Sequence, residues 1–196
     1  EELCQIYPWE VLMREHQIVT QAGDTGKYPL PTDFLYMLNQ TGWERAENTP
    51  LFGPLSPQDW AYLKGRDLVN GDIYASFRLQ EGVFTLFPQP PPAGLDINFE
   101  YISRNWVIDS SVSSGSSNFE LDALKLLDRV KVGADTPVFD RTLLSRMLKV
   151  KFLEAKGLDT TKAQGDLNQA LQMLTSHDKG APILNTGGGG RSFQYL

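Results

Sequence analysis

IYASFRLQEGVFTLFPQPPPAGLDINFEYISRNWV, residues 73–107, is the stretch that decides the fold class. Three parts of it alternate between apolar and polar residues, which is the period of a half-buried β-strand. QEG at 80–82 and PQPPPAG at 88–94 separate these parts with residues that favour turns. We therefore expect a three-stranded antiparallel meander over residues 73–107.

Other extended segments precede this meander. Residues 9–20 alternate loosely, with β-branched residues towards the end, and AGDTG at 22–26 follows them. This pattern predicts a strand and a hairpin turn. Residues 37–46 and 49–55 predict short extended pieces, whereas YPLPTDF at 28–34 is too rich in proline for a regular element.

A second hairpin is expected after the meander. The serine-rich stretch at 110–118 is polar and predicts an exposed loop. The β-branched residues Val130 and Val132 favour a strand behind it. We expect the chain to run out along 103–109 and to return along 126–132.

Two short helices are expected in the N-terminal part. Residues 1–8 have the pattern of the end of a helix, which Pro8 terminates, so we expect this helix to begin before Glu1. Ser56 is a suitable N-cap, Pro57 suits the first helical position, and Gly65 suits the C-terminus. These signals predict a helix over 56–65.

The C-terminal part predicts a helical hairpin over 139–178. One helix is expected from Asp140 to Gly157 and a second from Thr160 or Thr161, and the short link makes them antiparallel. The expected apolar face of the first helix comprises Leu144, Leu148, Phe152 and Ala155, with Leu143 and Met147 beside it. That of the second comprises Ala163, Leu167, Ala170, Leu171 and Leu174.

These elements define an α+β fold class. An antiparallel β-domain, made of the meander and the long hairpin, occupies residues 9–138 behind the helix end at 1–8. The helical hairpin follows at 139–178. Residues 179–196 have no periodicity and are expected to form an extended C-terminal arm.

Composition excludes several classes of function. The net charge of −6 argues against a nucleic-acid reader, which normally has a basic face. Cys4 is the single cysteine, so no intrachain disulfide or thiolate cluster is expected, and this fits a reducing compartment. The sequence contains no apolar run long enough to predict a membrane span.

No constellation of residues predicts catalysis. GGGGR at 187–191 lacks the strand and the helix that frame a phosphate loop. His16 and His177 lie in unlike elements, and His16 is expected to be a polar surface residue. The acidic residues near helix starts suit capping, and none has a histidine at metal-ligand spacing. We expect no enzyme activity, no cofactor and no metal.

The aromatic residues allow two interpretations. They could form a platform on a sheet that binds sugars or bases. The favoured interpretation is the core of a small β-domain, in which aromatic pairs add packing energy. The residues concerned are Trp43, Trp60, Phe77, Phe84, Phe87, Phe99, Tyr101 and Trp106.

Ordered patches of the sequence carry a family resemblance. They are YPLPTDFLYMLNQTGWERAENTPLFGPLSPQDWAYLKG at 28–65, FRLQEGVFTLFPQPPPAGLDINFEYISRNWV at 77–107 and ADTPVFDRTLLSRMLKVKFLEAKGLD at 134–159. Over roughly residues 9 to 180 the chain resembles the head-to-tail adaptor (connector) proteins of tailed bacteriophages. The serine-rich loop and the nearly absent first long helix depart from that pattern.

The resemblance implies a structural virion protein at the head–tail interface, made in the host bacterial cytoplasm. Such adaptors form a ring, usually twelvefold, below the capsid portal. Their helices meet the portal protein, their β-part faces the next tail component (tail tube, nozzle or stopper), and genomic DNA passes through the bore without specific binding. An acidic bore would repel DNA rather than hold it.

The C-terminal residues ILNTGGGGRSFQYL, 183–196, are expected to dock on the portal. Fourteen extended residues reach at most about 45–50 Å. Alternating apolar residues suit strand addition to a sheet edge, and glycines allow close backbone approach. The expected docking residues are Ile183, Leu184, Gly187, Gly188, Gly189, Gly190, Arg191, Phe193, Tyr195 and Leu196. The alternative is a C-terminus that docks on nothing.

Three other functions stay open at this point. The chain could be another tail ring component, such as a stopper or tail-tube protein. It could be a carbohydrate-binding β-module on a tail that uses its aromatic residues. The third alternative is an enzyme, which the lack of paired catalytic groups disfavours.

Overall fold

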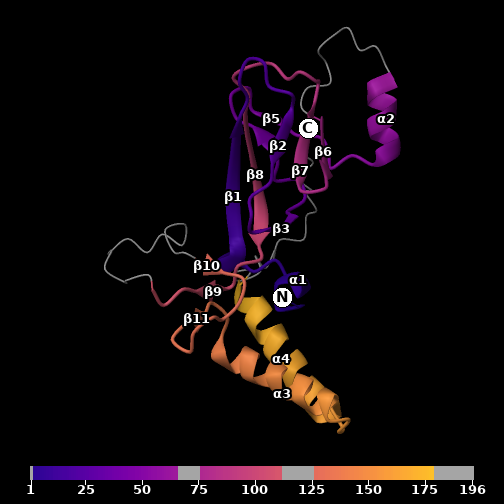
Figure 1. The fold of residues 1–196 in the computed structure, drawn as a ribbon. Helices are drawn as coiled ribbons and strands as arrows, with labels where there is room; N and C mark the ends of the chain where they lie inside the picture. Colours follow the sequence, from indigo (N-terminus) through magenta and orange to yellow (C-terminus); the bar gives the residue numbers. More distant parts are fainter. Residues whose placement is uncertain (1, 66–75, 112–125, 179–196) are drawn as a thin grey trace, which may run out of the picture. The chain divides into compact units, whose positions relative to one another are not determined.

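The computed structural model describes residues 2–65, 76–111 and 126–178, and the chain forms two compact units, residues 1–138 and 139–196. The first unit contains antiparallel sheets and short helices, and the second contains a helical hairpin (Figure 1). The predicted α+β class is confirmed. The predicted arm at 179–196 lies outside the described residues.

A five-stranded sheet is built around the long strand β8 (Asp96–Ser103). Strand β1 (Met13–Val19) pairs with β8 over its whole length, from Met13 opposite Ile102 to Val19 opposite Asp96. Strands β3 (Phe34–Met37) and β4 (Trp43–Glu44) pair with the other edge of β8, and β5 (Thr49–Pro50) pairs with β4.

A second sheet contains β2 (Lys27–Pro29), β7 (Val83–Phe87) and β6 (Ser76–Gln80), in that order. Strands β6 and β7 form the hairpin expected from the alternation. Its two turn residues, Glu81 and Gly82, both have positive φ, at 52° and 76°. Two positive φ angles match the twist of a tight hairpin, which explains glycine at the second position.

The predicted meander is wrong in its last step, because β8 does not pair with β7. The proline-rich segment 88–94 instead carries the chain into the other sheet, where β8 pairs with β1. Thr20 fixes the new position: its hydroxyl donates to the Pro92 carbonyl at 2.6 Å, and its backbone N–H donates to the Leu95 carbonyl at 3.0 Å.

The predicted hairpin around 22–26 is also wrong. Strand β2 follows this turn but pairs with β7, not with β1. Tyr28 and Pro29, which the proline content assigned to irregular structure, are part of β2. A proline is tolerated there because β2 is an edge strand of its sheet.

The two sheets share one core, and stacked phenylalanines join them. The ring centroids of Phe77 and Phe84 lie 4.9 Å apart, and those of Phe84 and Phe99 lie 5.3 Å apart. Phe84 is on β7 and Phe99 is on β8, so the stack crosses from one sheet to the other. Packing face to face buries both rings, which explains why β8 leaves the sheet of β7.

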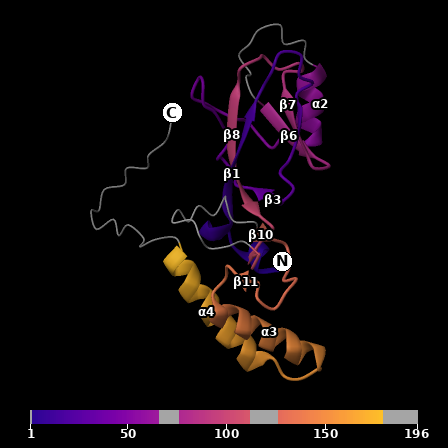
Figure 2. The ribbon, with the colours of Figure 1, turned by 60° about the vertical axis from the view of Figure 1, so that its left-hand side comes forward.

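Helix α2 (Pro57–Gly65) covers the other face of the second sheet. Trp60 packs edge-on against Phe87, which points away from the Phe84 side of β7. Figures 1 and 2 both show β6 and β7 lying between α2 and the β1–β8 pair. The Ser56 hydroxyl accepts from the Asp59 N–H at 3.1 Å, as expected of an N-cap.

A small third sheet contains β9 (Val107–Ile108), β10 (Leu126–Leu127) and β11 (Thr136–Pro137). The expected return strand pairs with β9 only at β10, and Val130 and Val132 are exposed outside any strand. The Asp135 carboxylate binds this segment by accepting from the N–H groups of Lys131 and Val132, both at 2.8 Å. Residues 112–118 of the expected serine loop lie outside the described residues.

The N-terminal segment contains α1 (Glu2–Ile6) and a short 3-10 helix, η1 (Glu10–Leu12). Leu3, Cys4 and Leu12 are buried. The Trp9 indole N–H donates to the Leu3 carbonyl at 2.8 Å, which ties the first turn of α1 to the start of the β-domain.

The second unit contains α3 (Arg141–Ala155) and α4 (Thr161–Asp178). Asp140 caps α3, as predicted, by accepting from the N–H groups of Thr142 at 2.7 Å and Leu143 at 3.1 Å. The Arg146 guanidinium donates to the Asp166 carbonyl at 2.7 Å and links the two helices. Gly157 has φ 65° just past α3, which is a glycine C-terminus.

The predicted apolar face of α4 is confirmed, whereas that of α3 is correct at Leu143 but wrong at Leu148 and Phe152. Ala163 and Ala170 are buried in α4, while in α3 the buried residues are Leu143 and Val150. Leu148 and Phe152, which were expected to line the packed face, are 69% and 60% exposed. The sequence of α3 contains two apolar stripes, and only one of them is buried.

Candidate functional site

The predicted arm residues, from Ile183 to Leu196, lie outside the described residues. The two histidines lie on different elements, His16 on β1 and His177 on α4. His16 is half-buried rather than a surface residue, and its ring packs edge-on against Phe99 at 5.4 Å. Burial lowers the pKa of His16 below its ordinary value of 6.5. His177 is exposed near the end of α4.

The most distinctive polar surface in the described residues is a groove on the five-stranded sheet. It has a volume of 450 Å³ and continues into a second hollow of 320 Å³. We call it the Trp43 groove and define it by Glu15, Gln17, Thr41, Trp43, Arg45, Asp96, Asn98 and Glu100.

Strand alternation explains why these side chains share one face. On β8, Ile97, Phe99 and Tyr101 belong to the core, so Asp96, Asn98 and Glu100 point to the opposite face. Gln17 on β1 and Trp43 on β4 both lie opposite Asn98. The register therefore aligns Gln17, Asn98 and Trp43 in a row across three strands.

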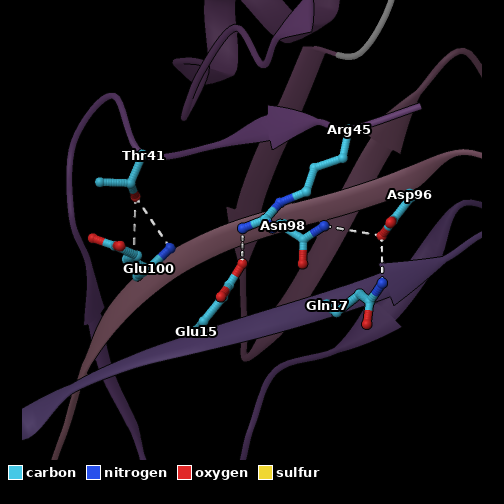
Figure 3. Close-up of polar contacts among 7 residues, drawn as sticks. All are labelled: Glu15, Gln17, Thr41, Arg45, Asp96, Asn98 and Glu100. Atoms are coloured by element: carbon cyan, nitrogen blue, oxygen red, sulfur yellow. Dashed lines mark hydrogen bonds and ion pairs between the residues drawn. The ribbon is translucent and has the colours of Figure 1, made fainter. Parts of the chain in front are cut away.

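Hydrogen bonds hold the polar side chains of the groove in place (Figure 3). The Asp96 carboxylate accepts from the Gln17 amide at 2.7 Å and from the Asn98 amide at 2.9 Å. The Arg45 guanidinium donates to the Glu15 carboxylate. The Thr41 hydroxyl donates to the Leu38 carbonyl at 2.8 Å and accepts from the Glu100 N–H at 3.2 Å.

Glu44 is a structural carboxylate beneath this groove. It is 2% exposed and accepts from the N–H groups of Ala46 at 3.0 Å, Glu47 at 2.6 Å and Asp96 at 3.2 Å. These bonds fix the turn after β4 and join it to the start of β8. Glu44 thereby positions its neighbours Trp43 and Arg45.

The groove offers groups that can bind a ligand. It combines donors, acceptors and an aromatic ring, but no cysteine, serine or histidine lines it. Among the described residues, no three side chains of His, Cys, Asp or Glu are grouped so that they could hold a metal ion. None of the described helices is long and apolar enough to cross a membrane.

Sequence reasoning missed the groove because it assigned Trp43 to the aromatic core. Trp43 is 45% exposed, whereas Trp9 is 5% and Trp60 is 6% exposed. The usable signal was the local sequence NQTGWER, in which polar residues surround a single large apolar side chain. For Trp60, Phe77, Phe84, Phe99 and Tyr101 the core prediction is confirmed.

Comparisons with known proteins leave the chain without an assigned family. No protein-family model matches the sequence, and a search of curated proteins finds no match either.

Proposed function

We propose that the chain is a structural adaptor of a tailed bacteriophage, which forms a ring between the capsid portal and the tail. Its partners are further copies of itself, the portal protein and the next tail component, and DNA passes through the ring. The proposal rests on the sequence patches at 28–65, 77–107 and 134–159. Their order along the chain is the order of the β-domain and the helical hairpin.

The observation that carries the proposal is the second apolar stripe of α3. Leu148 and Phe152 are separated by four residues, so they lie on the same side of the helix. Both side chains are more than half exposed, although α3 already buries Leu143 and Val150. Neighbouring exposed apolar side chains on one helix face can contribute to a contact site with another protein.

A ring accounts for such a face. Ring contacts are heterologous, so one surface of each copy meets a different surface of its neighbour. An apolar stripe that the described part of the chain leaves uncovered is then buried in the assembly. The net charge of −6 is consistent with a conduit that does not retain DNA.

Substitution of the stripe tests this proposal. We expect the double variant Leu148→Glu, Phe152→Glu to fold, because both residues are exposed, and to lose assembly with the portal protein of the same virus. A suitable control is Gln169→Glu with Gln172→Glu, which adds the same charge at exposed positions of α4. Sedimentation of each variant with the portal measures assembly. Equal assembly of both double variants would refute this role of the stripe.

Another ring component of the tail, such as a stopper or tail-tube protein, is the second candidate. The exposed stripe fits that class equally well, because those proteins also assemble through repeated contacts. Antibody labelling of virions would separate the two. An adaptor is labelled at the junction of head and tail, and a tail-tube protein is labelled further down.

A further inference from the structure

We infer that the Trp43 groove binds a neutral saccharide chain. This inference does not depend on the adaptor proposal. It starts from Trp43, whose side chain is 45% exposed although burying a large apolar side chain is worth about 1.5–3 kcal/mol. An exposed indole within a polar groove provides a flat apolar surface, which the C–H face of a pyranose ring can cover.

The polar side chains around Trp43 suit hydroxyl groups. A sugar hydroxyl both donates and accepts hydrogen bonds. The groove offers donors on Arg45, acceptors on Glu100 and both on Asn98. Figure 3 shows the amide oxygens of Asn98 and Gln17 turned away from Asp96, where they can accept from a ligand. The mixture of functions distinguishes this groove from a site for a simple anion or cation.

The existing partners of the groove carboxylates favour a neutral ligand over a basic peptide. The Glu15 carboxylate is paired with Arg45, and the Asp96 carboxylate accepts from two amides. The buried Glu44 carboxylate accepts from three backbone N–H groups. These three carboxylates therefore already have hydrogen-bond partners within the protein, which a basic ligand would have to replace.

The shape of the groove suits a chain of sugars. The volume of 450 Å³ lies within the range of about 300–1,000 Å³ that is typical of small-ligand sites. The adjoining hollow extends it along Gln17 and Asp96, and the two share Glu15, Arg45 and Asn98. Because hydrogen bonds already fix these side chains, binding would cost little side-chain entropy.

An array of neutral polysaccharides, probed with the full chain, tests the inference. We expect at least one neutral polysaccharide to bind. Titration of that polysaccharide should show affinity reduced at least about tenfold in Trp43→Ala and reduced in Glu100→Ala. Tyr62→Ala is the matched control, because Tyr62 is an exposed aromatic residue (61%) outside the groove, and it should bind like the unmodified chain.

Three results would overturn the inference. The first is that no polysaccharide on the array binds. The second is that Trp43→Ala binds the selected polysaccharide as tightly as the unmodified chain. The third is that an arginine-rich peptide, rather than a saccharide, binds in a way that depends on Trp43. If Trp43→Ala does not fold, the unmodified chain is titrated with the polysaccharide and its amide NMR shifts are measured. The inference requires that the shifted residues cluster on β1, β4 and β8, and shifts elsewhere would overturn it.

Discussion

Phe84→Ala should strongly destabilise the β-domain, because Phe84 is the ring that joins the two sheets. Its side chain is 0% exposed and lies between Phe77 and Phe99, with interplanar angles of 11° and 4°. A buried Phe→Ala substitution costs about 3–5 kcal/mol of unfolding free energy. Loss of two stacked partners, each worth about 0.5–1.5 kcal/mol, places this variant towards the upper end.

Urea unfolding followed by tryptophan fluorescence measures the loss of stability in the β-domain. All four tryptophans lie within residues 1–138, so the signal reports on the β-domain and not on the helical hairpin. Phe52→Ala is the matched control: the Phe52 side chain is 60% exposed, and its removal should change stability by less than about 0.5 kcal/mol.

A double-mutant cycle on Phe84 and Phe99 then tests the contact between the sheets directly. We expect a coupling of about 0.5–1.5 kcal/mol, the range measured for aromatic pairs. A loss below about 1 kcal/mol for Phe84→Ala, or no coupling between the two rings, would refute the face-to-face packing of the sheets.

Three further perturbations have defined outcomes in the same urea assay. Gly53→Ala should lower the free energy of unfolding by about 1–3 kcal/mol, because a Cβ at Gly53 would lie 2.5 Å from the Phe77 carbonyl oxygen. Gly65→Ala is the control and should have no such effect, because a Cβ at Gly65 would have nothing within 4 Å. Equal effects of the two substitutions would contradict the packing at Gly53. The unfolded chain binds a proton at His16 more readily than the folded chain, because the folded-state pKa of His16 is lowered. The free energy of unfolding should therefore fall as the pH drops from 6.5 through this lowered pKa. His16→Gln should reduce this pH dependence, and an unchanged pH dependence would exclude His16 as its source. Backbone N–H groups lower the pKa of Asp135 well below 3.8, so the Asp135 carboxylate stabilises the fold above pH 3.8 and this stabilisation is lost on further acidification. Asp135→Asn should be less stable at neutral pH, and its stability should depend less on acid pH. Equal acid sensitivity of the variant and the unmodified chain would contradict this role of Asp135.

Local signals in the sequence were sufficient for the elements but not for their pairing. The β6–β7 hairpin, the capped helix α2 and the α3–α4 hairpin follow from alternation, turn residues and caps within short windows. The partner of β8 is β1, about eighty residues earlier in the sequence. A period-2 pattern identifies a strand and its faces but does not say which strand lies beside it.

The buried face of α3 could not be chosen from its sequence. Leu143 and Val150 define one apolar stripe, and Leu148 and Phe152 define another, at equally good helical spacing. The choice depends on the tertiary structure around α3, and in the partner helix α4 the buried residues are Ala163 and Ala170. Trp43 was missed for a similar reason, because a tryptophan in a β-domain is more often buried than exposed.

The most direct test of the proposed function is electron microscopy of the purified chain mixed with a phage portal protein encoded in the same genome. The account predicts a closed ring of additional density on one end of the portal, around an open channel. The resemblance to phage adaptors implies twelvefold symmetry for this ring. Portal particles without additional density, with the chain remaining as separate single copies, would contradict it.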